Sequence, residues 1–366
     1  MSDESSANKE RPAWLLRTPA RRDEVEATGG LRSLLLRLMR GEDLERAEAS
    51  ALLDALLDVE ATDAQIAAAL VALAVKGETV EELTGMALAM RARSVRLESR
   101  HSCFIDTAGT GSSSAKTFNV STAAAFVIAG AGLAVAKHGS RAATSRSGSA
   151  DVLAALGVNV SAAPDISARC LNEFGICFMF APLYHGATAR VAGIRRELGV
   201  QTTFNLLGPL TNPAGAPRQI IGVWHAALVQ PLARVLAELG TERAWVIHGA
   251  DGLDEVTLAD KTFVAEADRG RIKSFEIGPG DFGLERASLE HLRGGDAWAN
   301  AETIREVLAG TRSDEARSLV LINAAAALHL GGVGSTLRDS AQLAAQSIDS
   351  GAALGKLEML VRETKR

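Results

Sequence analysis

The feature of this sequence that most restricts its fold is a succession of short apolar runs, each of which ends in polar residues and leads into a helical stretch. The runs are "CFIDTAG", "LAVAKHG", "GICFMFAP", "QIIGVWH" and "AWVIHGADG". An apolar strand, a polar loop and a helix in this order are typical of βα units, which assemble a largely parallel sheet. Because ligands of such proteins collect at the carboxyl ends of the strands, we expect a functional site where these runs end.

The chain ahead of these runs is predicted to be helical. The segment "TDAQIAAALVALAVKG" begins with Thr62 and has Gln65 three residues later, which predicts a capping box, and its last glycine predicts the end of the helix. The segment "TVEELTGMALAMRARS" repeats the capping box with Thr79 and Glu82. Far downstream, "KTFVAEADRGRIKSFEIGPGDFG" predicts an antiparallel hairpin that turns at "DRG". We expect an α/β protein with a small N-terminal helical domain and a larger α/β domain that has a mostly parallel central sheet.

Charge and cysteine content exclude several classes of protein. The net charge of -5 and the isoelectric point near 5.9 argue against a protein that coats nucleic acid or anionic lipid, because such surfaces need clustered Lys and Arg. Cys103, Cys170 and Cys177 form no C-x-x-C pair, which favours a reducing cytoplasm over a disulfide framework. The N-terminus lacks the apolar segment of a secretory signal, and no apolar run approaches the ~20 residues that span a membrane.

The stretch "DTAGTGSSSAKTFNVST" invites comparison with a nucleotide-binding P-loop. That loop would need glycines at the positions of Thr110 and Ala115, so the P-loop interpretation fails. Asn119, Ser121 and Thr122 instead precede a small apolar helix, where outward-pointing amide groups and the helix dipole favour an anion. The alternative is that these residues form an ordinary N-cap.

Two further loops carry charge patterns suited to phosphate. The loop "AKHGSRAATSRSGS" places Lys137, Arg141 and Arg146 among hydroxyls and glycines, which suits a phosphate or diphosphate, although an ordinary polar loop remains possible. In "VIHGADGLDEVTL", Asp254 and Glu255 could hold Mg²⁺, or they could belong to a charged turn. Together the loops predict a transferase that acts on a phosphorylated, and specifically a diphosphorylated, small molecule.

Six motifs in fixed order resemble those of the anthranilate phosphoribosyltransferases. They are "GTG…TFNVST", "VAKHGSR…SGSADVLAALG", "FMFAPLYH", "IRRELG", "TTFNLLGPLTNPA" and "GLDEV", spread between about residues 30 and 340. The resemblance implies transfer of phosphoribose from phosphoribosyl diphosphate (PRPP) to the amine of anthranilate, which gives N-(5-phosphoribosyl)anthranilate and diphosphate in tryptophan biosynthesis. It also implies Mg²⁺, with two ions per active site, and a homodimer formed through the helical domain.

The resemblance assigns roles to individual positions, and it provides no general base. The residues that it implies for PRPP are Gly109, Gly111, Ser112, Ser113, Thr117, Asn119, Ser121, Thr122, Lys137, Ser145 and Ser149. Those implied for anthranilate are Gly109, His138, Gly139, Ser140, His185, Arg195 and Pro209, where Arg195, and not Arg196, pairs with the carboxylate. Those implied for Mg²⁺ are Ser121, Asp254 and Glu255.

Domain bounds follow from the same resemblance. We expect a tail over residues 1–27, a helical domain over 28–100 that is completed by about 184–204, an α/β domain over 101–345, and a C-terminal helix over 346–366.

The chain also departs from the family pattern at three places. Ser112 and Ser113 follow "GTG" where relatives have a glycine followed by Asp or Gly, Ser140 replaces an asparagine, and Gly186 replaces the proline after the pocket histidine. Other interpretations are a non-catalytic offshoot that binds nucleic acid, an enzyme like the pyrimidine nucleoside phosphorylases, and a purely structural dimer. The retained lysine, arginine and acidic pair favour the transferase, with PRPP and anthranilate rather than nucleic acid or membrane as partners.

Overall fold

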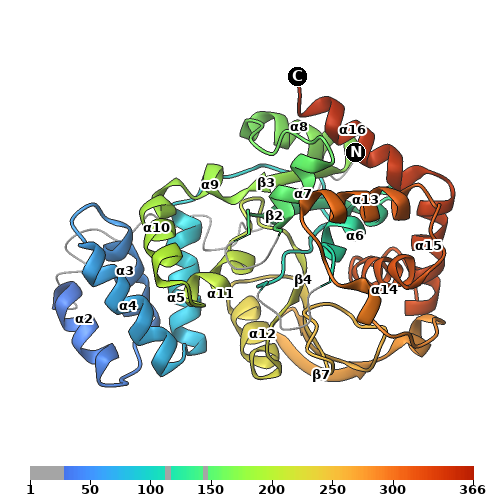
Figure 1. The fold of residues 1–366 in the computed structure, drawn as a ribbon. Helices are drawn as coiled ribbons and strands as arrows, with labels where there is room; N and C mark the ends of the chain where they lie inside the picture. Colours follow the sequence, from blue (N-terminus) through green and yellow to red (C-terminus); the bar gives the residue numbers. More distant parts are fainter. Residues whose placement is uncertain (1–28, 112–116, 143–146) are drawn as a thin grey trace, which may run out of the picture.

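A computed structural model describes residues 29–111, 117–142 and 147–366. A helical unit lies beside a larger α/β unit (Figure 1). The helical unit consists of α2 (Gly30–Met39), α3 (Arg46–Leu57), α4 (Asp63–Lys76) and α5 (Val80–Ala92). Two later helices, α10 (Ala189–Leu198) and α11 (Thr203–Leu210), share its hydrophobic core.

Local signals define the ends of these helices. Both predicted capping boxes are confirmed: Thr62 begins α4 with Gln65 as its reciprocal partner, and Thr79 begins α5 with Glu82. Gly77 ends α4 with a φ of 84°, a left-handed conformation that glycine adopts without steric cost. The helical unit therefore follows from sequence signals that each lie within a few residues.

The α/β unit is built on a seven-stranded sheet in the order β3-β2-β1-β4-β5-β6-β7. The predicted apolar runs form the parallel part: β1 (Phe104–Asp106), β2 (Ala134–Gly139), β3 (Ile176–Phe180), β4 (Arg218–Gly222) and β5 (Arg243–Gly249). The predicted hairpin is also confirmed, as the antiparallel strands β6 (Thr262–Asp268) and β7 (Arg271–Ile277). It turns at Arg269 and Gly270, which both have positive φ.

Each face of the sheet packs on its own core, because alternate residues of a strand point to opposite sides. On β5, Trp245 and Ile247 belong to one core, whereas Ala244 and Val246 belong to the other. The first core is covered by α6 (Val120–Gly130), α7 (Ser149–Ala155), α8 (Pro164–Phe174), α13 (Ala297–Leu308), α14 (Glu315–Leu330), α15 (Leu337–Asp349) and α16 (Ala352–Glu363). The second is covered by α12 (Val229–Glu238) and the helical unit.

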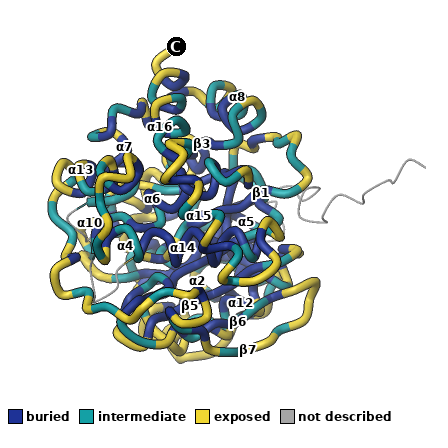
Figure 2. The backbone as a smooth tube through the Cα atoms, turned by 90° about the vertical axis from the view of Figure 1, so that its right-hand side faces the viewer, coloured by how far each residue is buried: buried dark blue, intermediate teal, exposed yellow. Residues whose placement is uncertain are grey.

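Burial decreases from the middle of the molecule to its rim. Figure 2 shows buried backbone at β1 and α14, whereas the edge strand β7 is mostly exposed or half-buried. Where the chain is described, no helix has the combination of length and apolarity needed to cross a bilayer. The short helix α9 (Ala181–Tyr184) follows β3 and leads to α10, so one edge of the sheet connects directly to the helical unit.

Candidate active site

A cavity of about 440 Å³ opens at the carboxyl ends of the parallel strands, where the strand pattern predicted a site. Every predicted site residue that the structure describes lies in its wall: Gly109, Gly111, Thr117, Asn119, Ser121, Thr122, Lys137, His138, Gly139, Ser140, Ser149, His185, Arg195, Pro209, Asp254 and Glu255. Ser112, Ser113 and Ser145 lie outside the described residues. Residues up to 146 positions apart in the sequence are thus brought to one cavity by the strand order.

The N-terminus of α6 binds an acidic side chain. Asn119 occupies the N-cap position, but its side chain caps no amide of the helix. Its side-chain NH₂ group donates to the Ser147 carbonyl at 3.4 Å, and its Oδ1 accepts from Asn300 at 3.1 Å. The Ser121 amide donates to Glu255 Oε1 at 3.2 Å, so a carboxylate occupies the helix N-terminus.

Lys137 connects β2 to the ends of β1 and α6. Its side chain is buried, and Nζ donates to the carbonyl and to the hydroxyl oxygen of Thr107, both at 3.1 Å. A longer bond of 3.4 Å reaches Ser121 Oγ. Burial lowers the pKa of Lys137, while the charges of Asp106 and Glu255 oppose that shift. Three hydrogen bonds therefore hold Nζ in place close to Ser121, whose amide binds Glu255.

Asp254 and Glu255 form an acidic pair in which each negative charge disfavours the other. Burial and the neighbouring Asp254 raise the pKa of Glu255 to about 8, and Lys137 opposes the shift. Glu255 is partly exposed in the cavity, but the surrounding protein shields its carboxyl group from most of the solvent. The loop is held by Asn323, whose side chain bonds both backbone groups of Val256.

These residues fit a divalent cation. Two carboxylates that repel each other and the Ser121 hydroxyl are the hard oxygen ligands that Mg²⁺ takes, and the cation would relieve the repulsion. Among the described residues, no cluster contains three or more His, Cys, Asp or Glu side chains in position for a metal. A Mg²⁺ ion here would therefore depend on water and substrate oxygens for its remaining ligands.

The loop after β2 approaches α7 closely. A Cβ atom on Gly139 would lie 2.2 Å from Ser149 Oγ, so a larger residue would push the two segments apart. Arg141 lines the cavity, but its guanidinium is already paired with Asp151 at 2.8 Å. Arg146, the third cation predicted for this loop, lies outside the described residues.

A second part of the wall is formed by α10 and α11. Arg195 is half-buried; its Nε donates to Thr202 Oγ1 at 3.0 Å and its Nη2 to Asn205 Oδ1 at 3.1 Å. Both partners are neutral, so neither compensates the positive charge. Arg196 is exposed and is absent from the cavity wall. Of the two adjacent arginines, only Arg195 can meet a ligand in this cavity.

Two neutral histidines also line the cavity. His138 and His185 are buried with their ring centroids 5.2 Å apart, and burial lowers their pKa values to about 3 and about 4. The Gly208 carbonyl lies 3.2 Å from His138 Nδ1, and because a carbonyl only accepts, Nδ1 carries the proton. Together with Pro209 the rings make an uncharged surface suited to an aromatic ligand.

Sequence reasoning missed several residues that hold the site together. Asp106 at the end of β1 accepts from the His138 amide at 3.1 Å and from Asn212 at 2.6 Å. Burial raises its pKa to about 6, against the opposing charge of Lys137. An acid at the end of a predicted strand was the available signal. Asn205 lies in the motif "TTFNLLGPLTNPA", but no role was assigned to it, and Asn300 belongs to no motif that the sequence analysis recognised.

Comparison with known proteins places the chain among its relatives. Models of a glycosyl transferase family match residues 32–94 (helical bundle domain) and 101–354 (a/b domain). The anthranilate phosphoribosyltransferase of Moorella thermoacetica is 52% identical over 331 residues, which cover 90% of this chain and 97% of that protein. The one from Anaeromyxobacter dehalogenans is also 52% identical, over 330 residues that cover 90% of this chain and 97% of that protein.

Solved structures agree with these relatives. The anthranilate phosphoribosyltransferase of Thermus thermophilus matches with a TM-score of 0.85 at 39% identity and covers 91% of this chain and 99% of its own. The Saccharomyces cerevisiae protein in complex with PRPP and Mg matches with a TM-score of 0.83 at 28% identity, covering 94% and 99%. The chain therefore belongs to the anthranilate phosphoribosyltransferase family.

Proposed function

We propose that this protein transfers phosphoribose from PRPP to the amine of anthranilate, which yields N-(5-phosphoribosyl)anthranilate and diphosphate in tryptophan biosynthesis. The observation that carries the proposal is the composition of one cavity. Lys137, the start of α6 and the acidic pair suit a diphosphate, whereas Arg195 and two neutral histidines suit an aromatic carboxylate. Two structures of the Saccharomyces cerevisiae relative, one with PRPP and Mg and one with 4-fluoroanthranilate, support both assignments.

The reaction moves charge in a direction that these residues accommodate. The bond between ribose C1 and the diphosphate oxygen breaks, and its electron pair leaves with the diphosphate. Lys137 and the positive end of the α6 dipole stabilise that developing negative charge where it forms. The arylamine lone pair forms the new bond to C1, and the nitrogen then loses a proton. Because a neutral arylamine is already nucleophilic, holding it in line matters more than deprotonating it beforehand.

Mg²⁺ would be held by Asp254, Glu255 and Ser121, and we propose two ions per active site. When bound, the metal neutralises charge on the diphosphate and orients it. The raised pKa of Glu255 supports this assignment, because a buried acidic pair gains most from a cation. Gly109, Gly111, Thr117, Asn119, Thr122 and Ser149 complete the wall that we assign to PRPP, together with Ser112, Ser113 and Ser145, which lie outside the described residues.

Anthranilate would occupy the wall made by His138, Gly139, Ser140, His185 and Pro209, with Gly109 at its boundary with PRPP. The Arg195 guanidinium would pair with the carboxylate through its remaining N–H groups, since a charged bidentate pair is stronger and more directional than a neutral bond. The flat histidine rings would contact the aromatic ring.

A direct assay tests this function. Purified protein is incubated with PRPP, Mg²⁺ and anthranilate, and both the consumption of anthranilate and the release of diphosphate are measured. We expect equimolar consumption and release that require all three components. Folded protein that shows no turnover at saturating substrate concentrations would contradict the proposal.

We also propose that the protein is a homodimer formed through the helical unit and that it works in the cytoplasm. A groove between α2 and α4 supports the homodimer, because a second copy would cover its apolar residues. It is lined by Leu38, Met39, Ala68, Val71, Ala72 and Val75, together with Arg40, Gly41 and Lys76. Three free cysteines support the location in the cytoplasm.

For the domains we keep the predicted bounds. The helical domain spans 28–100 and is completed by about 184–204, and the α/β domain spans 101–345. A tail spans 1–27 and a terminal helix spans 346–366.

A further inference from the structure

The two ends of α5 both reach across to α11. Glu78 lies directly ahead of Thr79, the N-cap of α5, and Arg91 lies in the last turn of the same helix. Glu78 Oε1 accepts a hydrogen bond from the Thr203 hydroxyl, and Thr203 is the first residue of α11. Arg91 Nε donates at 2.8 Å to the carbonyl of Leu210, the last residue of α11. A single helix of the helical unit thus holds both ends of a single helix in the cavity wall.

The Arg91 contact is buried and charged. Only 4% of this residue is exposed, and its Nη1 also lies 3.4 Å from the Leu239 carbonyl at the end of α12. The last carbonyls of a helix have no partner within the helix and carry the negative end of its dipole, so a guanidinium is well matched to two such ends. Burial lowers the pKa of Arg91 to about 10, which leaves it a cation at neutral pH.

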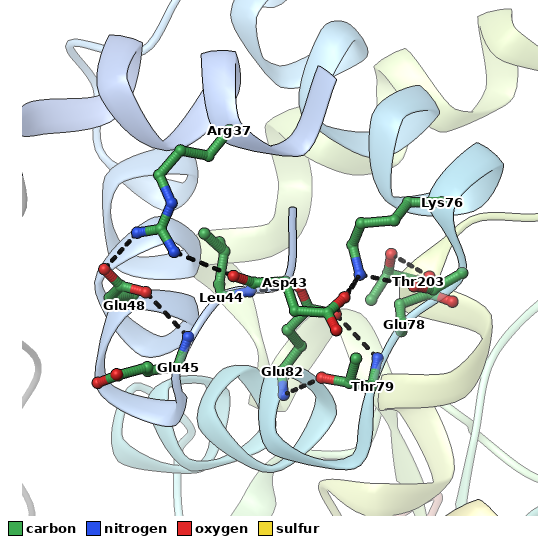
Figure 3. A network of polar contacts seen from close by, with 11 residues as sticks. Arg37, Asp43, Leu44, Glu45, Glu48, Lys76, Glu78, Thr79, Glu82 and Thr203 are labelled. Atoms are coloured by element: carbon green, nitrogen blue, oxygen red, sulfur yellow. Dashed lines mark hydrogen bonds and ion pairs between the residues drawn. The ribbon is translucent and has the colours of Figure 1, made fainter. Parts of the chain in front are cut away.

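The Glu78 contact comes from a loop that is itself fixed. Figure 3 shows Glu78 directed at Thr203, beside a network centred on Lys76 and Glu82. Lys76 Nζ donates to Glu82 Oε2 at 2.9 Å and to the Gly77 carbonyl at 2.8 Å. The side chain of Glu82 is fully buried and also accepts from the Thr79 amide at 2.8 Å. These bonds fix the position of the loop between α4 and α5, and therefore the position of Glu78.

The N-terminal end of α11 holds the side chain of Arg195. Thr202, the N-cap of α11, and Asn205 in its first turn accept the hydrogen bonds that Arg195 donates from Nε and Nη2. Gly208, near the end of α11, binds His138. The hydrogen bonds of Lys137 and Glu255 described above go instead to Thr107, directly after β1, and to Ser121 of α6. A shift of α11 would therefore move the proposed anthranilate wall and leave the proposed diphosphate wall in place.

We propose that Glu78 and Arg91 are positioning residues for the aromatic substrate: they clamp α11 at its two ends and so set the place of Arg195. The proposal rests on the proposed function. Neither residue is among those that line the cavity, and α11 is the part of the cavity wall that both of them contact.

Steady-state kinetics with each substrate varied in turn test the clamp. The variants are Arg91→Met, which keeps an unbranched apolar stem but none of the donors, and Thr203→Val, which removes the hydroxyl that Glu78 binds. In each variant, the loss of a buried hydrogen bond should raise the KM for anthranilate about tenfold. The KM for PRPP should stay within about twofold of the wild-type value. Arg91→Lys, which restores the charge and one donor, should recover part of the loss.

The matched control is Arg93→Met. Arg93 lies two residues from Arg91, but its guanidinium binds Asp54 within the helical unit, with Nε 2.5 Å from Oδ1. This control should leave the KM for anthranilate unchanged. A second control is the pair Arg91→Met and Arg195→Ala, which should be no worse than Arg195→Ala alone, because a clamp that acts through Arg195 has nothing left to position.

The outcomes separate the two proposals. A wild-type protein without turnover would contradict the proposed function, and the clamp with it. Turnover in the wild-type protein, with Thr203→Val and Arg91→Met affecting both KM values equally or neither, would overturn the clamp alone. If Arg91→Met fails to fold, Thr203→Val decides, since it loses a single hydroxyl at an otherwise unchanged position. Additive losses in the double variant would also overturn the clamp.

Discussion

Single residues of the site are buried charges that are held in place by specific partners. Lys137 is buried among oxygens of Thr107 and Ser121, and Asp106 is buried among amide donors. An isolated buried charge is costly, and each of these groups is stabilised by an opposite charge or a hydrogen bond. The result is a set of fixed dipoles and charges that need not reorganise when a charged substrate arrives.

Arg195 gives the first prediction at this scale. Arg195→Ala removes the guanidinium that we assign to the anthranilate carboxylate, and loss of a charge-assisted hydrogen bond should raise the KM for anthranilate about ten- to hundredfold. Initial rates at varied anthranilate and saturating PRPP measure this. Arg196→Ala is the matched control, because Arg196 is exposed and should leave the kinetics unchanged. Unaltered anthranilate kinetics in Arg195→Ala would refute the assignment.

Glu255 gives the second prediction at the scale of single residues. Glu255→Gln keeps the shape of the side chain but removes its charge, so the Mg²⁺ concentration needed for half-maximal activity should rise about tenfold or more. A titration of activity with Mg²⁺ measures this. Glu276→Gln, an exposed carboxylate on β7 that pairs with Lys261, serves as control. Equal Mg²⁺ requirements in wild type and Glu255→Gln would show that this carboxylate holds no metal.

His185 predicts a pH dependence of stability. Its pKa is about 4 in the folded protein and near 6.5 in an unfolded chain, so the unfolded state binds a proton first as the pH falls. The stability that the neutral ring contributes above pH 6.5 is therefore lost between about pH 6.5 and 4. Between pH 7 and 5 the wild-type protein should lose about 2 kcal/mol more unfolding free energy than His185→Phe, measured by urea denaturation. Parallel pH profiles of the two proteins would contradict the shifted pKa.

Elements meet at the site through close backbone contacts. The end of β4 touches two loops, because the Thr110 amide donates to the Gly222 carbonyl at 2.9 Å and a Cβ on Gly222 would lie 1.6 Å from the Asp254 carbonyl oxygen. Glycine at this position is therefore a packing requirement of the site. It lets the loop that carries the acidic pair lie directly against the end of a strand.

Gly222→Ala tests that requirement. The added methyl must push the Asp254 loop away, which should cost about 1–3 kcal/mol of stability and raise the Mg²⁺ requirement at the same time. Thermal unfolding and Mg²⁺ titration measure the two effects. Gly280→Ala is the control, because a Cβ on Gly280 meets nothing within 4 Å. A Gly222→Ala protein with wild-type stability and Mg²⁺ response would contradict the close contact.

At the scale of the whole molecule, two hydrophobic cores share one sheet. The core between the sheet and the helical unit includes Phe204 and Leu207 of α11, so the aromatic wall of the cavity is packed from the helical side. The helical unit also presents apolar residues outward, with Met39 70% exposed and Val75 84% exposed. A groove of this kind on an otherwise polar surface favours association.

Val75→Asp tests the proposed dimer. A charge in the groove between α2 and α4 should convert dimer to monomer, because an unpaired charge in an apolar interface is costly to bury. Sedimentation at several protein concentrations measures the mass, and circular dichroism checks that the fold is kept. Val333→Asp, on the surface of the α/β unit, is the control and should not change the mass. A wild-type protein that sediments as a monomer would refute the dimer.

Elements that depend on neighbours in the chain were predictable. The strand-loop-helix order, the capping boxes at Thr62 and Thr79 and the hairpin at Arg269 each rest on residues within a few positions of one another. The short-range order of polar and apolar residues determines such features, because backbone hydrogen bonds within an element link near neighbours. The location of the site at the strand ends followed from the same order.

The sequence by itself thus determined the elements, the sheet class and, through its resemblance to a family, sixteen of the residues that line the cavity. Only the tertiary structure decided which distant groups support them. Asn300 binds Asn119 across 181 positions, Asn212 binds Asp106 across 106, and Arg91 binds the end of α11 across 119. The physical reason is that these contacts arise when packing of the sheet and helices closes long loops of chain, and no short-range pattern records which residues will then meet.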